Sequence, residues 1–183
     1  MTGNCPAGEA NPAAGCRNAG QHMKNCYPDI HVINAYAVDY RGMYDEGYRG
    51  IIYDIDNTLV LHGAPADDRA RALIEELHEI GYQTIILSNS TGRRAGAFAS
   101  AVGSEVETGG RKPLPGKFYV CMERMGTTPE TTMCIGDQVF TDILGANLAG
   151  VTSVLTDPLS PEELFWVKMK RPFERRFRAG RDA

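Results

Sequence analysis

Residues 50–60 read GIIYDIDNTLV, a short apolar run that ends on two aspartates one residue apart. Such a run is typical of a strand buried in a parallel sheet, and ligands of open α/β sheets bind beyond the carboxyl ends of these strands. Because side chains two positions apart share one face of an extended chain, we expect Asp54 and Asp56 to point together into that crevice. Two carboxylates so close repel each other unless a cation or a shared proton neutralises them. The pair therefore indicates a metal site and an aspartate that can act as a nucleophile, the alternative being a charged turn after a strand.

Two further polar segments follow along the chain. Residues 82–87 form another apolar strand candidate, which ends at Ser88 and Asn89. A hydroxyl and backbone N–H groups at a strand end, before a helix, can hold phosphate oxygens. Lys112 stands beside a proline and could neutralise both a phosphate and a nucleophile as a compact point charge. Either segment alone is a weak signal, because turns and loops contain many such residues.

The last segment adds carboxylates. Residues 132–135 read as a strand and lead into Asp137, with Asp142 on the next turn. Mg²⁺ takes one or two carboxylates together with water and phosphate oxygens. Asp54 and Asp137 therefore fit as ligands of a Mg²⁺ cofactor.

The ordered set Asp-x-Asp-Asn-Thr, Ser-Asn, Lys-Pro and Gly-Asp-x-x-x-x-Asp resembles the motifs of the haloacid dehalogenase superfamily of phosphatases. The full motif sequences resemble those of the subclass IIIA branch known as the YqeG family, which includes phosphatidylglycerophosphate phosphatases. These sequences are DIDNTLV, SNS, RKP and GDQVFTDILGAN. The likeness covers most of the chain, and GDQVFTD is its most specific part. It implies a Rossmann-like α/β core, with a parallel sheet flanked by helices, and a hydrolase of phosphoric monoesters.

The resemblance implies catalytic roles for the matching residues. Asp54 would be the nucleophile, and Lys112 would stabilise charge on the phosphoryl group. Asp56 would protonate the leaving group and then activate the water that hydrolyses the aspartyl-phosphate. Ser88 and the backbone N–H of Asn89 would bind phosphoryl oxygens. For its acid role Asp56 must keep its proton, so we expect its pKa to lie above the ordinary value of about 3.9.

The resemblance also implies a Mg²⁺ site. Its ligands would be Asp54, Asp137 and the backbone carbonyl of Asp56. Asp142 would support the metal shell, either as a ligand through water or by orienting Lys112. Phosphoryl transfer depends mostly on positioning and on neutralising the phosphoryl oxygens, which agrees with this arrangement.

The 183 residues fit one domain. We expect a disordered leader over residues 1–26, rich in Gly, Ala, Asn and Pro, and a single phosphatase domain over residues 27–183. The intervals between the motifs, 57–87 and 91–111, are too short for a cap domain, which would need about 50 residues. After a helical or irregular segment at 29–48, the periodicity predicts helices at 68–81, 93–102, 116–125 and 141–149, and a last strand at 151–155.

Composition narrows the setting of the protein. No run of about 18 apolar residues exists to span a membrane, and residues 1–23 lack a signal-peptide layout. We therefore expect a cytoplasmic protein. The five cysteines, at 5, 16, 26, 121 and 134, lack the close pairs of a zinc ribbon. We expect reduced thiols, with Cys121 and Cys134 as core residues.

Residues 165–183 differ in charge from the rest of the chain. They contain seven Lys or Arg and two acids, a net charge of +5, whereas residues 1–164 contain twelve and twenty-one, a net charge of −9. Aromatic residues interleave with these cations, as in segments that lie on anionic lipid. The alternatives are a terminal segment that packs on the sheet, or contact with RNA, which the sequence favours less. We expect peripheral contact with the inner membrane face as one option, and no nucleic-acid partner.

Two classes of function remain. The first is a Mg²⁺-dependent phosphatase, with phosphatidylglycerophosphate as the leading substrate and soluble nucleotide or sugar phosphates as the alternative. The second is a non-catalytic adaptor in ribosome assembly that keeps the shell of such an enzyme. All the catalytic positions are present, which weighs against the second class.

Overall fold

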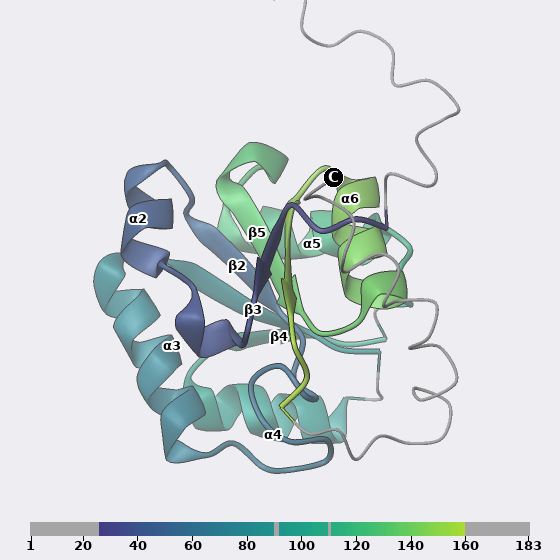
Figure 1. Ribbon diagram of the computed structural model, residues 1–183. Coiled ribbons are helices and arrows are strands. Elements are labelled where there is room, and N and C mark those ends of the chain that lie inside the picture. The colour runs from purple at the N-terminus through teal and green to yellow at the C-terminus, as the bar shows by residue number, and fades with distance from the viewer. Residues whose placement is uncertain (1–25, 90–91, 110, 160–183) are drawn as a thin grey trace, which may run out of the picture.

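The computed structural model describes residues 26–89, 92–109 and 111–159 (Figure 1). The predicted leader, apart from Cys26, and the basic aromatic segment at 165–183 lie outside these ranges. Within them, six parallel strands form one sheet with the order β1-β6-β5-β2-β3-β4. The strands are Ile30–Val32 (β1), Gly50–Tyr53 (β2), Gln83–Leu87 (β3), Glu105–Glu107 (β4), Thr132–Gly136 (β5) and Thr152–Thr156 (β6).

Helices connect the strands. Their bounds are Tyr40–Asp45 (α2), Asp68–Ile80 (α3), Arg93–Val102 (α4), Gly116–Met125 (α5) and Leu144–Ala149 (α6), with 3₁₀ turns at Ala35–Ala37 (η1) and Pro129–Thr131 (η2) and a π-helical turn at Val139–Ile143 (η3). Helix α3 shows how the sequence sets these bounds. The Asp67 carboxylate accepts a hydrogen bond from the Ala70 N–H at 2.8 Å, which caps the first turn. Gly81, with φ of 114°, ends the helix in the left-handed conformation that glycine adopts freely.

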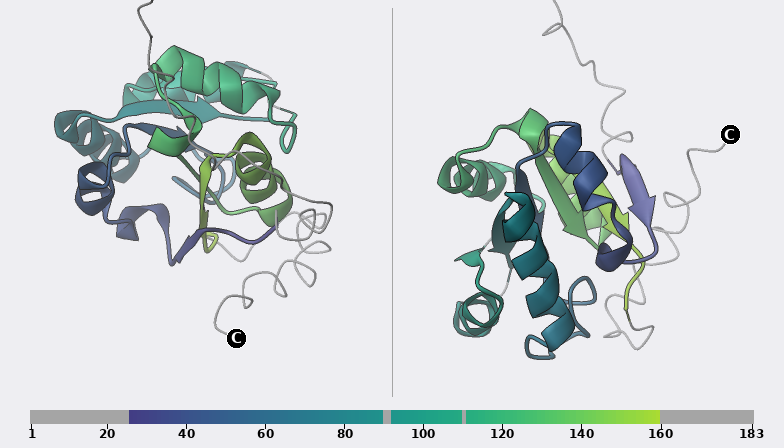
Figure 2. Two further views of the ribbon diagram at one scale, coloured as in Figure 1. Left: turned by 90° about the horizontal axis from the view of Figure 1, so that it is seen from above. Right: turned by 90° about the vertical axis from the view of Figure 1, so that its left-hand side faces the viewer.

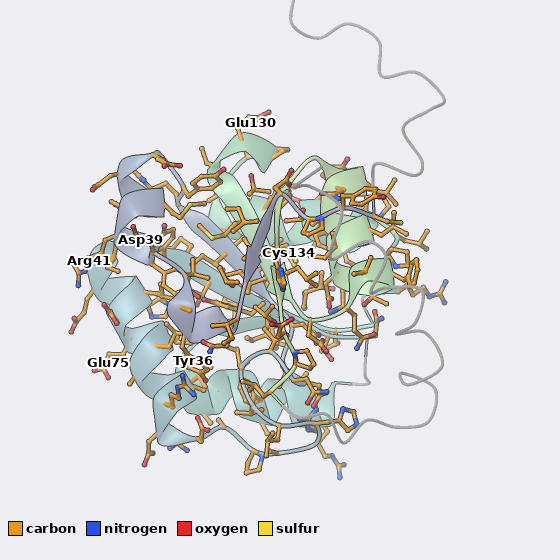
Figure 3. All side chains as sticks on the ribbon, viewed as in Figure 1. Tyr36, Asp39, Arg41, Glu75, Glu130 and Cys134 are labelled. Atoms are coloured by element: carbon orange, nitrogen blue, oxygen red, sulfur yellow. The ribbon has the colours of Figure 1, made fainter. Side chains whose placement is uncertain are left out.

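Both faces of the sheet are covered by helices (Figure 2). Ile51 and Tyr53 of β2 belong to the apolar core under α2, α3 and α4, whereas Ile52 belongs to the core under α5 and α6. A strand buried on both faces has to be apolar at every position, which explains the continuous run in β2. Figure 3 shows Cys134 inside these layers, while Arg41 and Glu75 lie on the outer surface of α2 and α3.

The topology brings the predicted site together. Because all six strands are parallel, their carboxyl ends lie at one edge of the sheet. Strands β5, β2 and β3 are adjacent in the middle of the sheet, and they are followed by Asp137, Asp54 and Ser88. The Asp54 N–H donates to the Ile135 carbonyl at 3.0 Å, so the two strand ends are level.

The predicted α/β fold is confirmed. In the described ranges, β2 leads to β3 through a loop and α3, and β3 leads to β4 through α4, so neither connection contains a cap domain. The same ranges contain no helix long and apolar enough to cross a bilayer. Cys121 and Cys134 are buried, as expected, and burial raises the pKa of Cys121 to about 12. Cys26, which we expected to belong to the leader, is buried as well.

Two edge strands were not predicted. Strand β1 lies inside the segment 29–48, for which we expected only helical or irregular structure, and β4 lies between two predicted helices. Both have three residues and occupy the two edges of the sheet, so they are only partly buried and lack a long apolar run. The helix predicted at 141–149 is also different, because it begins as a π-helical turn at Val139.

Candidate active site

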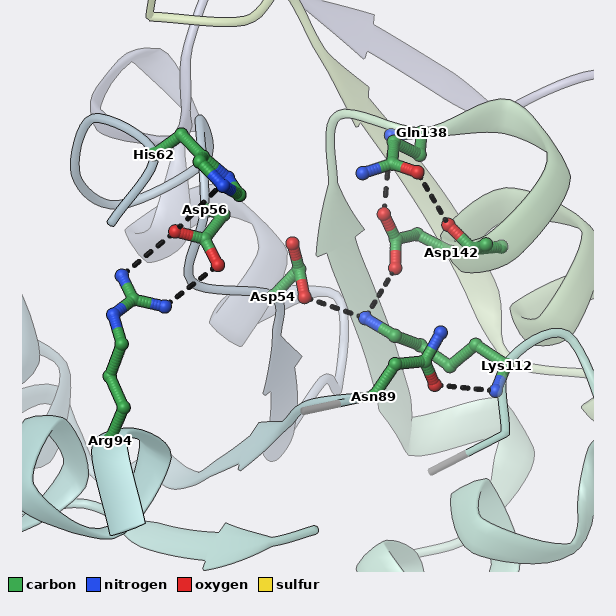
Figure 4. A network of polar contacts seen from close by, with 9 residues as sticks. Asp54, Asp56, His62, Asn89, Arg94, Lys112, Gln138 and Asp142 are labelled. Atoms are coloured by element: carbon green, nitrogen blue, oxygen red, sulfur yellow. Dashed lines mark hydrogen bonds and ion pairs between the residues drawn. The ribbon is translucent and has the colours of Figure 1, made fainter. Parts of the chain in front are cut away.

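A chain of ion pairs lies at the carboxyl edge of the sheet (Figure 4). Lys112 Nζ donates to Asp54 Oδ1 at 2.7 Å and to Asp142 Oδ1 at 2.6 Å. The side chains of Lys112 and Asp142 are 4% and 1% exposed, and that of Asp54 is 13% exposed. Lys112 is fixed from its backbone as well, because its N–H donates to Asn89 Oδ1 at 2.7 Å. The ammonium group is therefore held between two carboxylates, and water has little access to it.

The π-helical turn after β5 sets the position of Asp142. The Gln138 N–H donates to Asp142 Oδ2 at 3.2 Å, while Asp142 Oδ1 receives Lys112. Gly136, the last residue of β5, makes room for this carboxylate. A Cβ atom at Gly136 would lie 2.5 Å from the Asp142 Cβ and Cγ atoms. Glycine is required here for close packing.

Three carboxylates lie close together at this site. Asp54, Asp137 and Asp142 each offer an oxygen atom, and these oxygens lie within 4.8 Å of one another. Asp137 and Asp142 are buried. One lysine cannot balance three ionised carboxylates, and an all-oxygen ligand set suits a hard cation such as Mg²⁺. The residues present therefore fit a divalent metal, which these three side chains could hold.

The cluster shifts the pKa of its members. Burial and, to a smaller extent, the nearby Asp142 carboxylate raise the pKa of Asp54 to about 6, against the opposing effect of the Lys112 charge. Burial lowers the pKa of Lys112, but Asp142 and Asp54 raise it by more, so it lies well above the ordinary value of lysine. Lys112 is therefore charged throughout the physiological pH range. The crowding of carboxylates instead destabilises the ionised form of Asp54.

Asp56 takes no part in the ion pairs of Lys112, although its charge is near enough to raise the pKa of Asp54. That the two carboxylates point into one crevice stays a prediction. Figure 4 shows the Asp56 carboxylate facing Arg94 and His62. Arg94 Nη1 donates to Asp56 Oδ2 and Arg94 Nη2 to Asp56 Oδ1, both at 2.8 Å, and the Gly63 N–H donates to Oδ1 at 2.8 Å. Our prediction that the pKa of Asp56 lies above its ordinary value is wrong. Burial raises the pKa of Asp56, but the hydrogen bonds from Arg94 and Gly63 outweigh burial and leave it below the usual value.

Arg94 is the site residue that the sequence analysis missed. It lies in the first turn of α4, where the positive end of the helix dipole disfavours a cation. An arginine in that place indicates that an acidic partner lies nearby, and this is the signal that could have found it. Its Nη2 atom also donates to the Ala64 carbonyl at 3.1 Å, so Arg94 ties α4 to the loop after Asp56.

The predicted phosphate-binding residues lie at the same edge. Ser88 directly follows β3 and is 6% exposed, and its N–H donates to the Glu107 carbonyl at 3.1 Å. The Asn89 side chain supports the backbone of Lys112. The binding of phosphoryl oxygens by the Ser88 hydroxyl and the Asn89 N–H stays a prediction, as does the backbone carbonyl of Asp56 as a metal ligand.

Comparisons with known proteins agree with this geometry. A family model described as a haloacid dehalogenase-like hydrolase matches residues 60–150. The probable phosphatase YqeG of Bacillus subtilis is 33% identical over 150 residues, which cover 81% of this chain and 87% of that protein. The chloroplastic/mitochondrial phosphatidylglycerophosphate phosphatase 1 of Arabidopsis thaliana is 28% identical over 164 residues, which cover 80% of this chain but only 45% of that protein.

A solved structure shows the same fold. It is the cobalt-bound form of deoxy-D-mannose-octulosonate 8-phosphate phosphatase from Haemophilus influenzae, which aligns with a TM-score of 0.50 and 21% identity. The alignment covers 62% of this chain and 80% of that chain. At this identity the likeness concerns the α/β core alone.

Proposed function

The chain belongs to the haloacid dehalogenase-like hydrolases and is a phosphoric monoester hydrolase, and from this premise we propose that it is a Mg²⁺-dependent phosphatase acting on phosphatidylglycerophosphate. The observation that carries the catalytic part is the buried chain from Asp54 through Lys112 to Asp142, with Asp137 beside it. It places a carboxylate nucleophile, a fixed cation and a set of metal ligands together at the carboxyl ends of the strands.

The proposed chemistry takes its residue roles from the resemblance to the family. The Asp54 carboxylate attacks phosphorus, the bond from phosphorus to the leaving oxygen breaks, and the departing alcohol takes a proton from Asp56. Asp56 has to acquire this proton first, because its hydrogen bonds with Arg94 and Gly63 outweigh burial and keep its pKa below the usual value in the free site. Water then attacks the aspartyl-phosphate, with Asp56 accepting its proton, and this step releases inorganic phosphate and restores Asp54. Lys112 Nζ lies 2.7 Å from Asp54 Oδ1, where it can stabilise charge on the phosphoryl oxygens without reorganisation. A divalent metal held by Asp54, Asp137 and Asp142 would supply further positive charge to the same oxygens.

The surface around the site supports a substrate held in a membrane. Three exposed large apolar side chains lie on loops at the catalytic edge, which is the end of the sheet where the carboxyl ends of the strands lie. They are Ile33 directly after β1, Leu61 after β2, and Leu114 two residues after Lys112. Their exposed fractions are 69%, 52% and 59%. Exposed apolar side chains on loops at the same end of the sheet as a polar site suit the interface between headgroups and acyl chains. The absence of an inserted cap domain in the described connections would let a headgroup approach from a flat surface.

One relative reported above names the lipid substrate. The Arabidopsis thaliana protein is a phosphatidylglycerophosphate phosphatase, but the chain spans less than half of its length. The Bacillus subtilis relative is named only as a phosphatase. The lipid substrate and a peripheral position at the inner membrane face therefore belong to the proposal, together with the dependence on Mg²⁺.

A phosphate-release assay on two forms of one headgroup tests the proposal. Phosphatidylglycerophosphate is presented in phosphatidylcholine vesicles, and its deacylated headgroup is presented in solution. Removing a half-exposed leucine from the interface should weaken docking by about 1 kcal/mol, or about fivefold. We expect Leu61→Ser and Leu114→Ser each to lower vesicle hydrolysis by about that factor and to spare the soluble headgroup.

Leu148→Ser serves as the matched control, because Leu148 is exposed on α6 rather than on a loop at the catalytic edge. It should leave both rates unchanged. Equal loss on both substrates in Leu61→Ser and Leu114→Ser would contradict the docking surface. A higher kcat/KM for nucleotide or sugar phosphates than for the lipid would assign the soluble alternative, and no turnover of any phosphomonoester would assign the adaptor.

A further inference from the structure

Several hydrogen-bond donors surround the Asp56 carboxylate, and its proposed role as an acid does not require them. Arg94 grips both carboxylate oxygens from α4, and the Gly63 N–H donates to Oδ1 from the loop on the other side. His62 Nδ1 lies 3.6 Å from the same Oδ1 atom. In Figure 4 this group of residues is separate from the pairs made by Asp54, Lys112 and Asp142.

The contacts of Asp56 with Arg94 oppose the proton transfer that the reaction needs. Arg94 donates to both oxygens of Asp56 and so fixes the orientation of the carboxylate, and turning this group toward a leaving oxygen next to Asp54 breaks at least one of the two contacts. Removing a guanidinium group from a half-buried carboxylate is unfavourable unless another anion takes its place. Some feature of the bound substrate must therefore make the exchange favourable.

We propose that Arg94 binds a second anionic group of the substrate, next to the phosphomonoester, and that this exchange releases Asp56. The inference rests on the proposed function and specifies its substrate class: a phosphomonoester joined through a short linker to a phosphodiester. The planar guanidinium fork of Arg94 matches a phosphate as well as it matches a carboxylate.

The surroundings of Arg94 fit this exchange. Its side chain is 35% exposed, so an anion can reach it, whereas Lys112 on the other side of Asp54 is buried. When Arg94 turns to the substrate, Gly63 and His62 still face Asp56, so its carboxyl group keeps partners. A substrate without a second anion has to separate Arg94 from Asp56 with nothing in exchange. That loss corresponds to a preference of about 5- to 150-fold for the substrate with two anions.

A soluble pair of compounds isolates this effect from lipid binding. Glycerol 3-phosphate carries the phosphomonoester alone, and deacylated phosphatidylglycerophosphate carries the same glycerol phosphate with a phosphodiester beside it. We expect wild-type kcat/KM to favour the second compound by 5- to 150-fold. Arg94→Gln should bring the ratio of the two kcat/KM values close to one.

Arg93→Gln is the matched control, because it removes one exposed arginine from the same helical turn. It should keep the wild-type ratio. Arg94→Lys keeps the charge but loses the planar guanidinium fork, and it should give an intermediate ratio. It replaces Arg94→Gln as the test if Arg94→Gln does not fold. A wild-type ratio near one would overturn the inference, and so would an equal loss on both compounds in Arg94→Gln, since that result would make Arg94 a positioning residue for Asp56 only.

Binding gives a second readout that is independent of turnover. Titration calorimetry on Asp54→Asn, with and without Arg94→Gln, should show the same ratio in the Kd values of the two compounds. If the wild-type enzyme hydrolyses neither compound, the proposed function fails, and these Kd values still decide the role of Arg94. Equal affinity for both compounds in Asp54→Asn would overturn the inference.

Discussion

Replacing Asp54 with asparagine should inactivate the protein and, in the absence of metal, make it more stable above about pH 6. The pKa of Asp54 is raised from 3.8 to about 6 in the folded protein. The folded state therefore binds this proton more tightly than the unfolded state, so the stability that the group contributes is present below pH 3.8 and is lost by about pH 6. At about 1.4 kcal/mol per pKa unit the loss is at most about 3 kcal/mol. Asparagine cannot ionise and avoids it, while Lys112 keeps Asp142 as a partner.

Thermal and urea unfolding in a chelator, at intervals from pH 3.5 to pH 8, measures this effect. For a chain of this size the variant should melt up to about 6–12 °C above the wild-type protein at pH 7.5. The difference should vanish toward pH 3.5, and Mg²⁺ should reduce it because the metal stabilises only the wild-type cluster. Asp56→Asn should show the opposite sign, because the pKa of Asp56 is lowered and its ionised form stabilises the fold above its ordinary pKa. A wild-type protein more stable than Asp54→Asn at pH 7.5 without metal would refute the argument.

Three further outcomes follow from the same geometry. A chelator should remove phosphatase activity and Mg²⁺ should restore it, whereas full activity of metal-free protein would contradict the proposed cofactor. Asp137→Ala should raise the Mg²⁺ concentration needed for half-maximal activity, and an unchanged requirement would place the metal elsewhere. Gly136→Ala should lower kcat by roughly 100-fold, because its Cβ would displace Asp142 and with it Lys112. Steady-state kinetics measures this loss, and wild-type kcat in a folded Gly136→Ala protein would show that the position of Asp142 is not critical.

The sequence predicts those parts of the fold that periodicity alone determines. Strand β2 and helix α3 have uninterrupted apolar patterns and clear end signals, and both lie where the sequence places them. Strands β1 and β4 are short and lie at the edges of the sheet, where partial burial leaves little pattern. They form because a neighbouring strand offers hydrogen-bonding groups, and this depends on tertiary structure.

The same division applies to the site. The residues at the strand ends could be predicted, because the ends of adjacent parallel strands meet at one edge of the sheet. The contact between Asp56 and Arg94 could not, since it depends on where α4 begins relative to the loop after β2. Arg94 reaches Asp56 across 38 positions of the chain, and no spacing rule connects the two. The lowered pKa of Asp56 follows from that contact, so it could not be foreseen either.

The central claim is that Asp54 becomes phosphorylated during turnover. Wild-type protein mixed with deacylated phosphatidylglycerophosphate and Mg²⁺, quenched in acid within the first turnover and digested, should yield a phosphorylated peptide that mass spectrometry assigns to Asp54. The modification should be absent in Asp54→Asn. In Asp56→Asn it should form more slowly, because the acid of the first step is lost, and also break down more slowly, because the base of the second step is lost. Phosphate release by Asp54→Asn at the wild-type rate, or phosphorylation of a different residue, would contradict the account.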